Sequence, residues 1–67
     1  MISIIIPTYN EARNIIKLLE EIKKSLRKKS YEVIVVDDNS PDHTADIALS
    51  LKKTHHVKVI KGNQSLA

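Results

Sequence analysis

The stretch Val33-Ile-Val-Val-Asp-Asp-Asn-Ser-Pro-Asp-His-Thr44 decides the fold of this 67-residue chain. Its apolar, β-branched run stops abruptly in polar, turn-forming residues, which is the pattern of a buried strand that ends in a loop. Residues 2–11 show the same pattern, because Ile2-Ser-Ile-Ile-Ile6 leads into Pro7-Thr-Tyr-Asn-Glu11. A helix-type pattern follows each segment, so the sequence predicts the unit strand, loop, helix twice in succession.

The hydrophobic spacing predicts five elements. Residues 2–6 form a strand, and Pro7 ends its hydrogen-bond ladder because proline has no N–H. A helix is predicted over about 11–28, with Asn10 as its N-cap and Glu11 favourably placed in its first turn. The later elements are a strand over 32–36, a helix from Ser40-Pro41-Asp42 to about Lys53, and a strand over 57–60 closed by a turn at Lys61-Gly62-Asn63.

The order β-α-β-α-β predicts an α/β fold with three parallel strands joined by right-handed crossovers. If the chain steps across the sheet in one direction, both helices cover the same face. The first two strands are nevertheless apolar on both faces, since Ile5 opposes Ile4 and Ile6, and Ile34 opposes its valine neighbours. Sheets of this kind normally have both faces covered. We therefore expect either a truncated domain or an obligatory partner, including self-association.

Size and composition limit the possibilities. A chain this short forms one small domain and buries only about 60% of its unfolded surface. Cysteine is absent, so there is no disulfide or thiolate metal site, and the composition suits a reducing compartment. No apolar run approaches the roughly 18–20 residues of a spanning helix, and the N-terminus lacks the layout of a signal peptide. We expect a cytoplasmic protein, either soluble or peripheral at the cytoplasmic membrane face.

The net charge is +3, and basic residues gather late in the first predicted helix, at Lys23, Lys24, Arg27, Lys28 and Lys29. They form either a solvated face that complements the helix C-terminus or a surface attracted to anionic membranes. Nucleic acid is not expected as a partner, because no aromatic stacking platform is interleaved with these cations.

The polar residues at the two strand ends carry the chemistry. Asp37 and Asp38 are neighbours in an extended segment, so their carboxylates point to opposite sides and have different tasks. One can bind backbone amides and shape the loop, while the other accepts hydrogen bonds from a ligand. Thr8 and Tyr9 open the first loop, where an aromatic ring can stack on a nucleotide base. Each feature alone also fits an ordinary turn, with Asp and Ser bonding the nearby backbone.

Together, Ile6-Pro-Thr-Tyr-Asn-Glu11 and Val35-Val-Asp-Asp-Asn-Ser-Pro-Asp-His-Thr44 resemble the opening motifs of glycosyltransferase family 2. The similarity is strongest to the polyprenol (dolichol) phosphate mannosyltransferase and glucosyltransferase branch, and it covers nearly the whole chain. It implies the N-terminal half of a GT-A domain, a Rossmann-like fold that binds a nucleotide-sugar donor such as GDP-mannose or UDP-glucose.

Residue by residue, the resemblance places Pro7, Thr8, Tyr9 and Glu11 around the base and ribose, with Asp38 facing the base and Asp37 beside it. None of these is a catalytic residue in such enzymes. The family's Asp-x-Asp motif, which binds Mg²⁺ or Mn²⁺, and its acceptor-side base are expected beyond Ala67. Residues 1–67 would then be a partial domain of an inverting transferase whose acceptor is a polyprenol phosphate or similar lipid phosphate at a membrane surface.

Two departures from the family pattern stand out. His43 occupies the place of a usual glycine, where a left-handed backbone would strain it. Gly62-Asn-Gln-Ser-Leu-Ala67 only partly matches the family's Asn-x-Gly-Leu segment. Neither His43 nor the adjacent pair His55 and His56 has the spacing of a metal site.

Two alternatives remain open. The chain can be a non-catalytic, truncated remnant that folds or acts only with another chain. An acidic pair in an α/β fold also suggests a receiver-like phosphoacceptor module, although receivers carry that pair after the first strand rather than the second.

Overall fold

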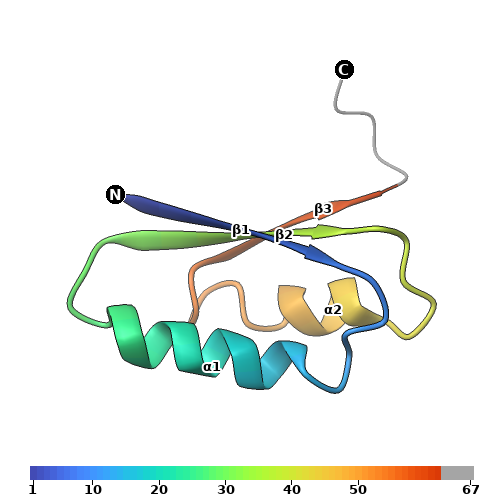
Figure 1. Cartoon of the computed structure of the whole chain (residues 1–67), viewed down its shortest axis with the longest axis horizontal. Coiled ribbons are helices and arrows are strands. Elements are labelled where there is room, and N and C mark those ends of the chain that lie inside the picture. Colours follow the sequence, from blue (N-terminus) through green and yellow to red (C-terminus); the bar gives the residue numbers. More distant parts are fainter. Residues whose placement is uncertain (63–67) are drawn as a thin grey trace.

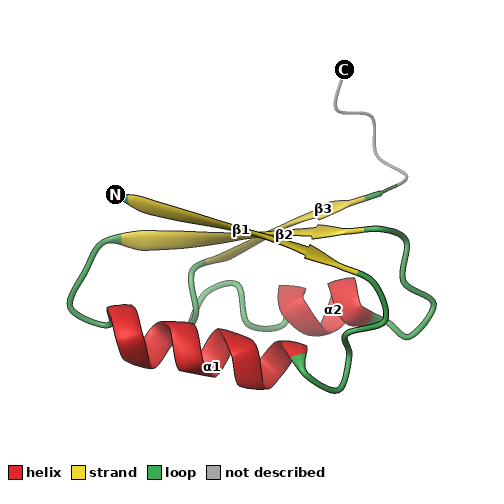
Figure 2. Ribbon diagram, viewed as in Figure 1, coloured by secondary structure: helices red, strands yellow, loops and turns green. Residues whose placement is uncertain are grey.

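The protein is described by a computed structural model that covers residues 1–62. Its elements are β1 (Ile2–Thr8), α1 (Ile15–Leu26), β2 (Tyr31–Asp37), α2 (Thr44–Leu49) and β3 (Val57–Lys61). The strands form one parallel sheet in the order β1-β2-β3. Both helices lie on the same side of this sheet (Figures 1 and 2). The predicted α/β fold with β-α-β-α-β order is therefore confirmed, and so is the one-sided placement of the helices.

The core lies between the sheet and the two helices. Side chains of β2 alternate strictly, so that every second residue from Tyr31 to Asp37 is buried under the helices. The core consists of aliphatic residues and one tyrosine: Ile15, Leu19, Tyr31, Val33, Val35, Ala48 and Val57. This arrangement makes β2 the best buried strand, because it has a neighbour on each side and a helix layer beneath it.

The other face of the sheet is uncovered by residues 1–62, as Figure 1 shows. Strand alternation places Ile5, Ile34, Val36 and Ile60 on this face, and the side chain of Ile5 is 65% exposed. Lys58 pairs with Glu32 at 3.4 Å near the other end of the same face. The prediction that the first two strands are apolar on both faces is confirmed by this burial pattern.

Pro7 does not end the first strand, contrary to the prediction. β1 continues to Thr8, and Pro7 is in register with Val36. The carbonyl of Thr8 accepts the N–H of Asp38, so Thr8 bonds toward β2 while the nitrogen of Pro7 faces the outer edge. Proline is tolerated there because an edge strand needs no donor on its free side. β2 and β3 are also slightly longer than predicted.

Both helices are shorter than predicted. α1 begins at Ile15 with Asn14 as its N-cap, so the assignment of Asn10 as the cap was wrong. Asn10 instead adopts a left-handed conformation with φ of 54°, and residues 12–14 form a turn before the helix. α2 begins at Thr44 and ends at Leu49, and residues 50–56 follow it as turns. Of the predicted turn at Lys61-Gly62-Asn63, Gly62 is in a turn, Lys61 still belongs to β3, and Asn63 with the partly family-like segment to Ala67 lies outside the described residues.

Candidate functional site

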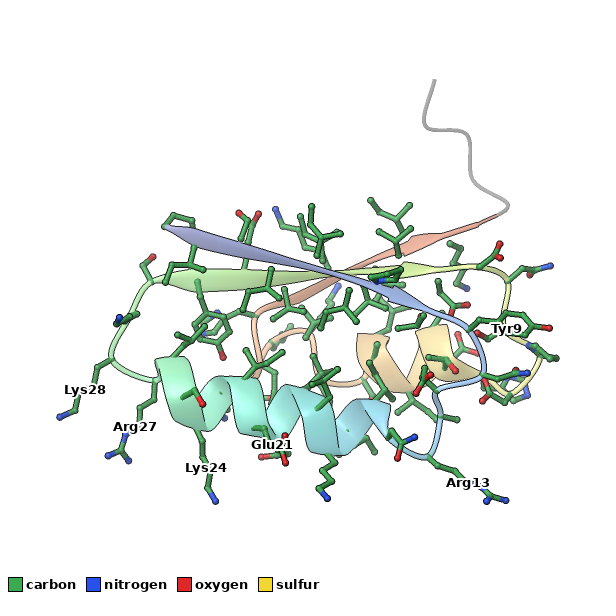
Figure 3. The ribbon with its side chains drawn as sticks, in the orientation of Figure 1. Tyr9, Arg13, Glu21, Lys24, Arg27 and Lys28 are labelled. Carbon is green, nitrogen blue, oxygen red and sulfur yellow. The ribbon has the colours of Figure 1, made fainter. Side chains whose placement is uncertain are left out.

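The carboxyl ends of β1 and β2 place the predicted site residues on one rim of the sheet. Thr8 and Asp37 are register partners, and the Thr8 hydroxyl donates to Asp37 Oδ1 at 2.7 Å. Tyr9 and Asp38 follow directly on the two strands, and both are exposed. Figure 3 shows Tyr9 at the end of the molecule where the two loops leave the sheet. Adjacent parallel strands bring these segments together from positions about thirty residues apart, as expected for such an edge.

Asp37 is a buried carboxylate whose hydrogen bonds come from its own loop and from β1. Its side chain is 2% exposed and accepts the Ser40 N–H at 2.9 Å and the Ser40 hydroxyl at 2.6 Å, besides the Thr8 hydroxyl. Burial raises the pKa of Asp37, but the hydrogen bonds from Ser40 and Thr8 outweigh it and hold that pKa below its ordinary value. Asp37 thus shapes the loop and has little capacity left for a ligand.

Asp38 is in the opposite situation. Its backbone N–H bonds to the Thr8 carbonyl, while its carboxylate is exposed and accepts no hydrogen bond from residues 1–62. A carboxylate anchored through its backbone and open to solvent can accept hydrogen bonds from an incoming ligand. The two neighbouring aspartates therefore differ in environment, as strand alternation predicted.

Gly62 packs closely against the backbone of Asp37 and Asp38. From the sequence, Gly62 was not predicted to belong to the site. Its N–H donates to the Asp37 carbonyl. A Cβ at this position would lie 3.1 Å from the Asp38 Cα and 3.2 Å from Asp38 Oδ1. The Asp37 carbonyl oxygen would be nearer still, at 3.0 Å, so a larger residue would require the backbone of Asp37 and Asp38 to shift by a few tenths of an ångström. The chain's single glycine, placed just beyond β3, is the signal that could have indicated this close approach.

The loop after β2 also holds the loop after β1, through three backbone N–H groups that donate to side chains. Asn10 N–H donates to the Ser40 hydroxyl at 2.9 Å, Glu11 N–H to the Thr44 hydroxyl at 3.0 Å, and Ala12 N–H to Asp42 Oδ2 at 3.1 Å. We call these three bonds the loop clamp. They satisfy amides that precede α1 and lack helical partners, which is the task the prediction gave to Asn10.

Asp42 and Thr44 are the central residues of the loop clamp. Asp42 Oδ1 accepts both the N–H and the hydroxyl of Thr44, and the hydroxyl bond is the main reason that the pKa of Asp42 lies below its ordinary value. Thr44 is completely buried. Sequence reasoning interpreted residues 40–44 only as a helix start, although a run of hydroxyls and a carboxylate beside a second loop was an available signal.

The predicted site residues lie around two separate cavities instead of one. A cavity of about 250 Å³ beside β1 is lined by Pro7, Thr8 and Glu11 together with apolar residues of β1 and α1. A smaller one of about 90 Å³ lies between the ends of β2 and β3 and includes Asp37. Tyr9 and Asp38 line neither cavity and stand on the rim. The structure thus brings all six predicted residues to one edge without enclosing them in one pocket.

The second cavity contains His43, the residue that replaces the family's usual glycine. His43 adopts the left-handed conformation with φ of 67°, and its Nδ1 lies 3.3 Å from Asp46 Oδ2. Asp46 also pairs with Lys61 Nζ at 3.7 Å. His43 thus holds the left-handed conformation that strains a residue with a Cβ, and it does so as the N-cap of α2, where its exposed ring contacts Asp46.

Residues 1–62 do not fit a divalent cation. No group of three His, Asp or Glu side chains among them could hold a metal ion. Asp37 is saturated by Thr8 and Ser40, while Asp46 pairs with His43 and Lys61. His55 has both ring nitrogens occupied, by Thr54 and Glu20. The family that the two motifs resemble generally uses a divalent cation, but these residues provide no site for one.

Comparison with known proteins identifies the family to which the chain belongs. The match to the family described as "Glycosyl transferase family 2" covers residues 3–66, so the chain belongs to glycosyltransferase family 2. Its three-stranded unit is the N-terminal part of a GT-A, Rossmann-like domain.

The curated relatives have more particular names. The "Dolichol-phosphate mannosyltransferase" of Pyrococcus furiosus is 47% identical over 60 residues, which are 90% of this chain and 17% of that protein. The "Dolichyl-phosphate beta-glucosyltransferase" of Drosophila melanogaster is 37% identical over 67 residues, covering 90% of this chain and 21% of its own length. The chain thus spans about a fifth of the relatives that it matches. None of the helices in residues 1–62 is both long and apolar enough to cross a membrane.

Proposed function

We propose that this chain is the donor-nucleotide-binding part of an inverting glycosyltransferase that transfers a sugar from a nucleotide sugar to a polyprenol phosphate or similar lipid phosphate. The observation that carries the proposal is the contrast between the two aspartates on the rim. The Asp37 carboxylate is occupied by hydrogen bonds from Thr8 and Ser40. Asp38 is held only through its backbone N–H, and its exposed carboxylate lies next to the first loop. The names of the relatives support a dolichol-linked acceptor and a mannosyl or glucosyl donor.

In this proposal each rim residue has a definite task. The exposed ring of Tyr9 stacks on the base, because a flat aromatic surface at the rim suits any base. Asp38 accepts a hydrogen bond from a base N–H or a ribose hydroxyl, since an ionised carboxylate is an acceptor only. Pro7, Thr8 and Glu11 line the neighbouring cavity and contact the ribose side. None of them acts as the catalytic base.

Sugar transfer itself needs groups that residues 1–62 do not provide. We place the divalent cation, its ligands and the acceptor-side base in the part of the enzyme that corresponds to the remaining four fifths of its relatives. The 67-residue chain would accordingly be a partial domain that binds nucleotide and transfers no sugar. A cytoplasmic location, at or near the membrane that holds the lipid acceptor, follows from the same proposal.

Ligand-observed NMR with UDP, GDP and free mannose tests the binding. We expect saturation transfer to at least one nucleotide with weak affinity, on the order of millimolar or about 4 kcal/mol, because only the nucleoside side of the site is present. Saturation transfer to mannose but to neither nucleotide would overturn the proposal. So would sugar transfer by this chain alone, with Mg²⁺ or Mn²⁺ and a polyprenol phosphate.

The variant Asp38→Asn tests the residue assignment. It retains the shape of the side chain but replaces one acceptor oxygen with a donor, so nucleotide binding should weaken by roughly 1–3 kcal/mol. Glu21→Gln makes the same chemical change on α1, away from the rim (Figure 3), and should leave binding unchanged. Equal nucleotide affinity of Asp38→Asn and the unsubstituted chain would refute the role of Asp38.

A second candidate function is a non-catalytic remnant that acts only with another chain. The exposed apolar side chains on the uncovered face of the sheet favour it, with Ile5 65% exposed. This candidate and the first differ in nucleotide binding by the isolated chain, so the NMR experiment separates them.

A further inference from the structure

The outer face of α1 carries a row of positive charge. Arg13, Lys17, Lys24 and Lys28 are spaced by four, seven and four residues, so they share one side of the helix and its flanking turns. The core residues Ile15, Leu19 and Ile22 occupy the opposite side. Figure 3 shows Arg13, Lys24, Arg27 and Lys28 extending away from the sheet. We call Arg13, Lys17, Lys24, Arg27 and Lys28 the basic face.

Cations far outnumber carboxylates on this surface. Residues 13–29 contain seven cations and two carboxylates, although the whole chain has a net charge of only +3. No cation among residues 13–29 forms an ion pair with a carboxylate of residues 1–62. Of the two carboxylates, Glu20 is directed to His55 Nε2 at 3.0 Å, and Glu21 lies at helical spacing from Lys17 and Lys24 without forming an ion pair with either. The cations of the basic face are therefore not used in salt bridges within residues 1–62.

The shape and composition of the basic face indicate what kind of partner it fits. None of its five residues lines either of the two cavities at the rim. It also lacks an aromatic platform for bases, because Tyr31 is buried and Tyr9 lies at the rim. Long, flexible, mostly lysine side chains on a convex helix suit a broad anionic surface. Each lysine or arginine near such a surface adds a similar amount to the free energy of binding.

We propose that the basic face of α1 binds the surface of a membrane that contains anionic phospholipids. The proposal goes beyond the nucleotide site and does not depend on it. The rim lies at one end of α1 rather than on its outer side, so a bilayer against α1 leaves Tyr9 and the two loops accessible (Figure 3). Much of the chain's acidic charge, including Asp37, Asp38, Asp42 and Asp46, lies at the rim and is kept away from the anionic headgroups.

Sedimentation with vesicles tests the proposal. The 67-residue chain is mixed with vesicles of phosphatidylcholine alone and of phosphatidylcholine with phosphatidylserine, at low and at physiological ionic strength. We expect binding to the phosphatidylserine vesicles only, and weaker binding as salt screens the attraction. Equal binding to both vesicle types, or no binding to either at low salt, would overturn the proposal.

A matched pair of variants separates the basic face from overall charge. Lys24→Gln with Lys28→Gln removes two cations from the face, and Lys52→Gln with Lys53→Gln removes two exposed lysines after α2. Each cation near the surface is worth about fivefold in partitioning. The first pair should thus lose roughly 25-fold and the second far less. Equal losses would refute the assignment, and so would tighter binding of the chain to single-stranded RNA or an acidic peptide than to the vesicles.

Two controls complete the experiment. Glutamine retains helix propensity close to that of lysine, so circular dichroism should show the same helix content in all variants. Asp38→Asn should leave vesicle binding unchanged. Failure of nucleotide binding with intact vesicle binding would refute the proposed function alone, and the reverse outcome would refute the membrane proposal alone.

Discussion

Asp37 illustrates how a single buried residue sets the response of this fold to pH. Its pKa is held below the ordinary value of 3.8, chiefly because hydrogen bonds from Ser40 and Thr8 outweigh the effect of burial. The ionised carboxylate is therefore favoured in the folded state. Its contribution to stability is fully present above its unfolded pKa and is lost as the pH falls through the lower folded pKa.

We accordingly expect the urea midpoint of unfolding to fall as the pH drops below about 4. Asp42 contributes in the same direction, because the Thr44 hydroxyl lowers its pKa as well. An Asp37→Asn variant should be less stable at neutral pH and show a shallower decline in acid than the unsubstituted chain. Identical acid profiles of the two proteins would contradict this account of Asp37.

His43 is the second residue with a clear energetic prediction. It holds a left-handed backbone, which costs a residue with a Cβ about 1–2 kcal/mol. His43→Gly removes this strain, but it also loses the contact with Asp46 and adds freedom to the unfolded chain, so we expect the free energy of unfolding to rise by at most about 0.5–1 kcal/mol. His43→Ala keeps the Cβ and loses the pairing with Asp46, and it should be less stable than the unsubstituted chain. Thermal or urea unfolding would detect both changes, and a glycine variant less stable than the alanine variant would contradict the strain argument.

At the scale of the elements, the loop clamp joins the start of α1 to the start of α2. Thr44 is completely buried, and its hydroxyl accepts from Glu11 N–H and donates to Asp42. Thr44→Val removes both bonds at nearly constant volume and should destabilise the fold by about 1–3 kcal/mol, the usual cost of unsatisfied buried groups. Thr44→Ser retains the hydroxyl and should recover most of this loss. If serine and valine cost the same, packing rather than hydrogen bonding determines the effect.

The elements also show what the sequence could predict. The β-branched runs and helical spacing were enough to predict five elements, their order and the parallel sheet, because those signals are local. Pro7 was misplaced because its tolerance depends on β1 being an edge strand, which is a property of the assembled sheet. Asn10 was assigned as a cap because its partners were sought nearby, whereas Ser40, Asp42 and Thr44 lie about thirty residues away.

The site was predictable to a similar extent. Adjacent strand ends brought Thr8, Tyr9, Asp37 and Asp38 to one rim, and strand alternation separated the environments of the two aspartates. The contact between Gly62 and Asp38 was not predicted, because it depends on a close approach of the chain after β3 to the end of β2, at which the single glycine was only an indirect hint. Ligand roles stay predictions for all six residues.

At the scale of the whole molecule, the uncovered sheet face should dominate solution behaviour. Exposed apolar area of this kind favours association, and a domain of this size has little stability to spare. We expect the isolated chain either to self-associate or to show a broad thermal unfolding transition with a low midpoint temperature. Sedimentation velocity and thermal unfolding would measure this, and a monomer with a sharp transition at high temperature would contradict it.

A pair of variants locates the cause of association. Ile5→Thr places a β-branched polar residue on the uncovered face and should reduce association, since the Ile5 side chain is 65% exposed there. Ile16→Gln changes an exposed isoleucine of α1, 46% exposed, and should have a smaller effect. Equal effects on the sedimentation profile would indicate that the sheet face is not the associating surface.

The purely parallel strand order also has a kinetic consequence. Ile2 pairs with Tyr31 and Val33 with Val57, so no strand can pair with its neighbour through a tight hairpin. More than twenty residues of chain must be closed into a loop before the first inter-strand bond forms. Closing this loop costs conformational entropy, and the cost comes before any strand pairing can compensate for it. During synthesis, β1, α1 and β2 can assemble as soon as residue 37 has left the ribosome, whereas β3 docks later on an edge that stays open until then. Until β3 docks, β2 is itself an edge strand and presents its unpaired backbone groups, so we expect a chaperone to bind the nascent chain at this edge.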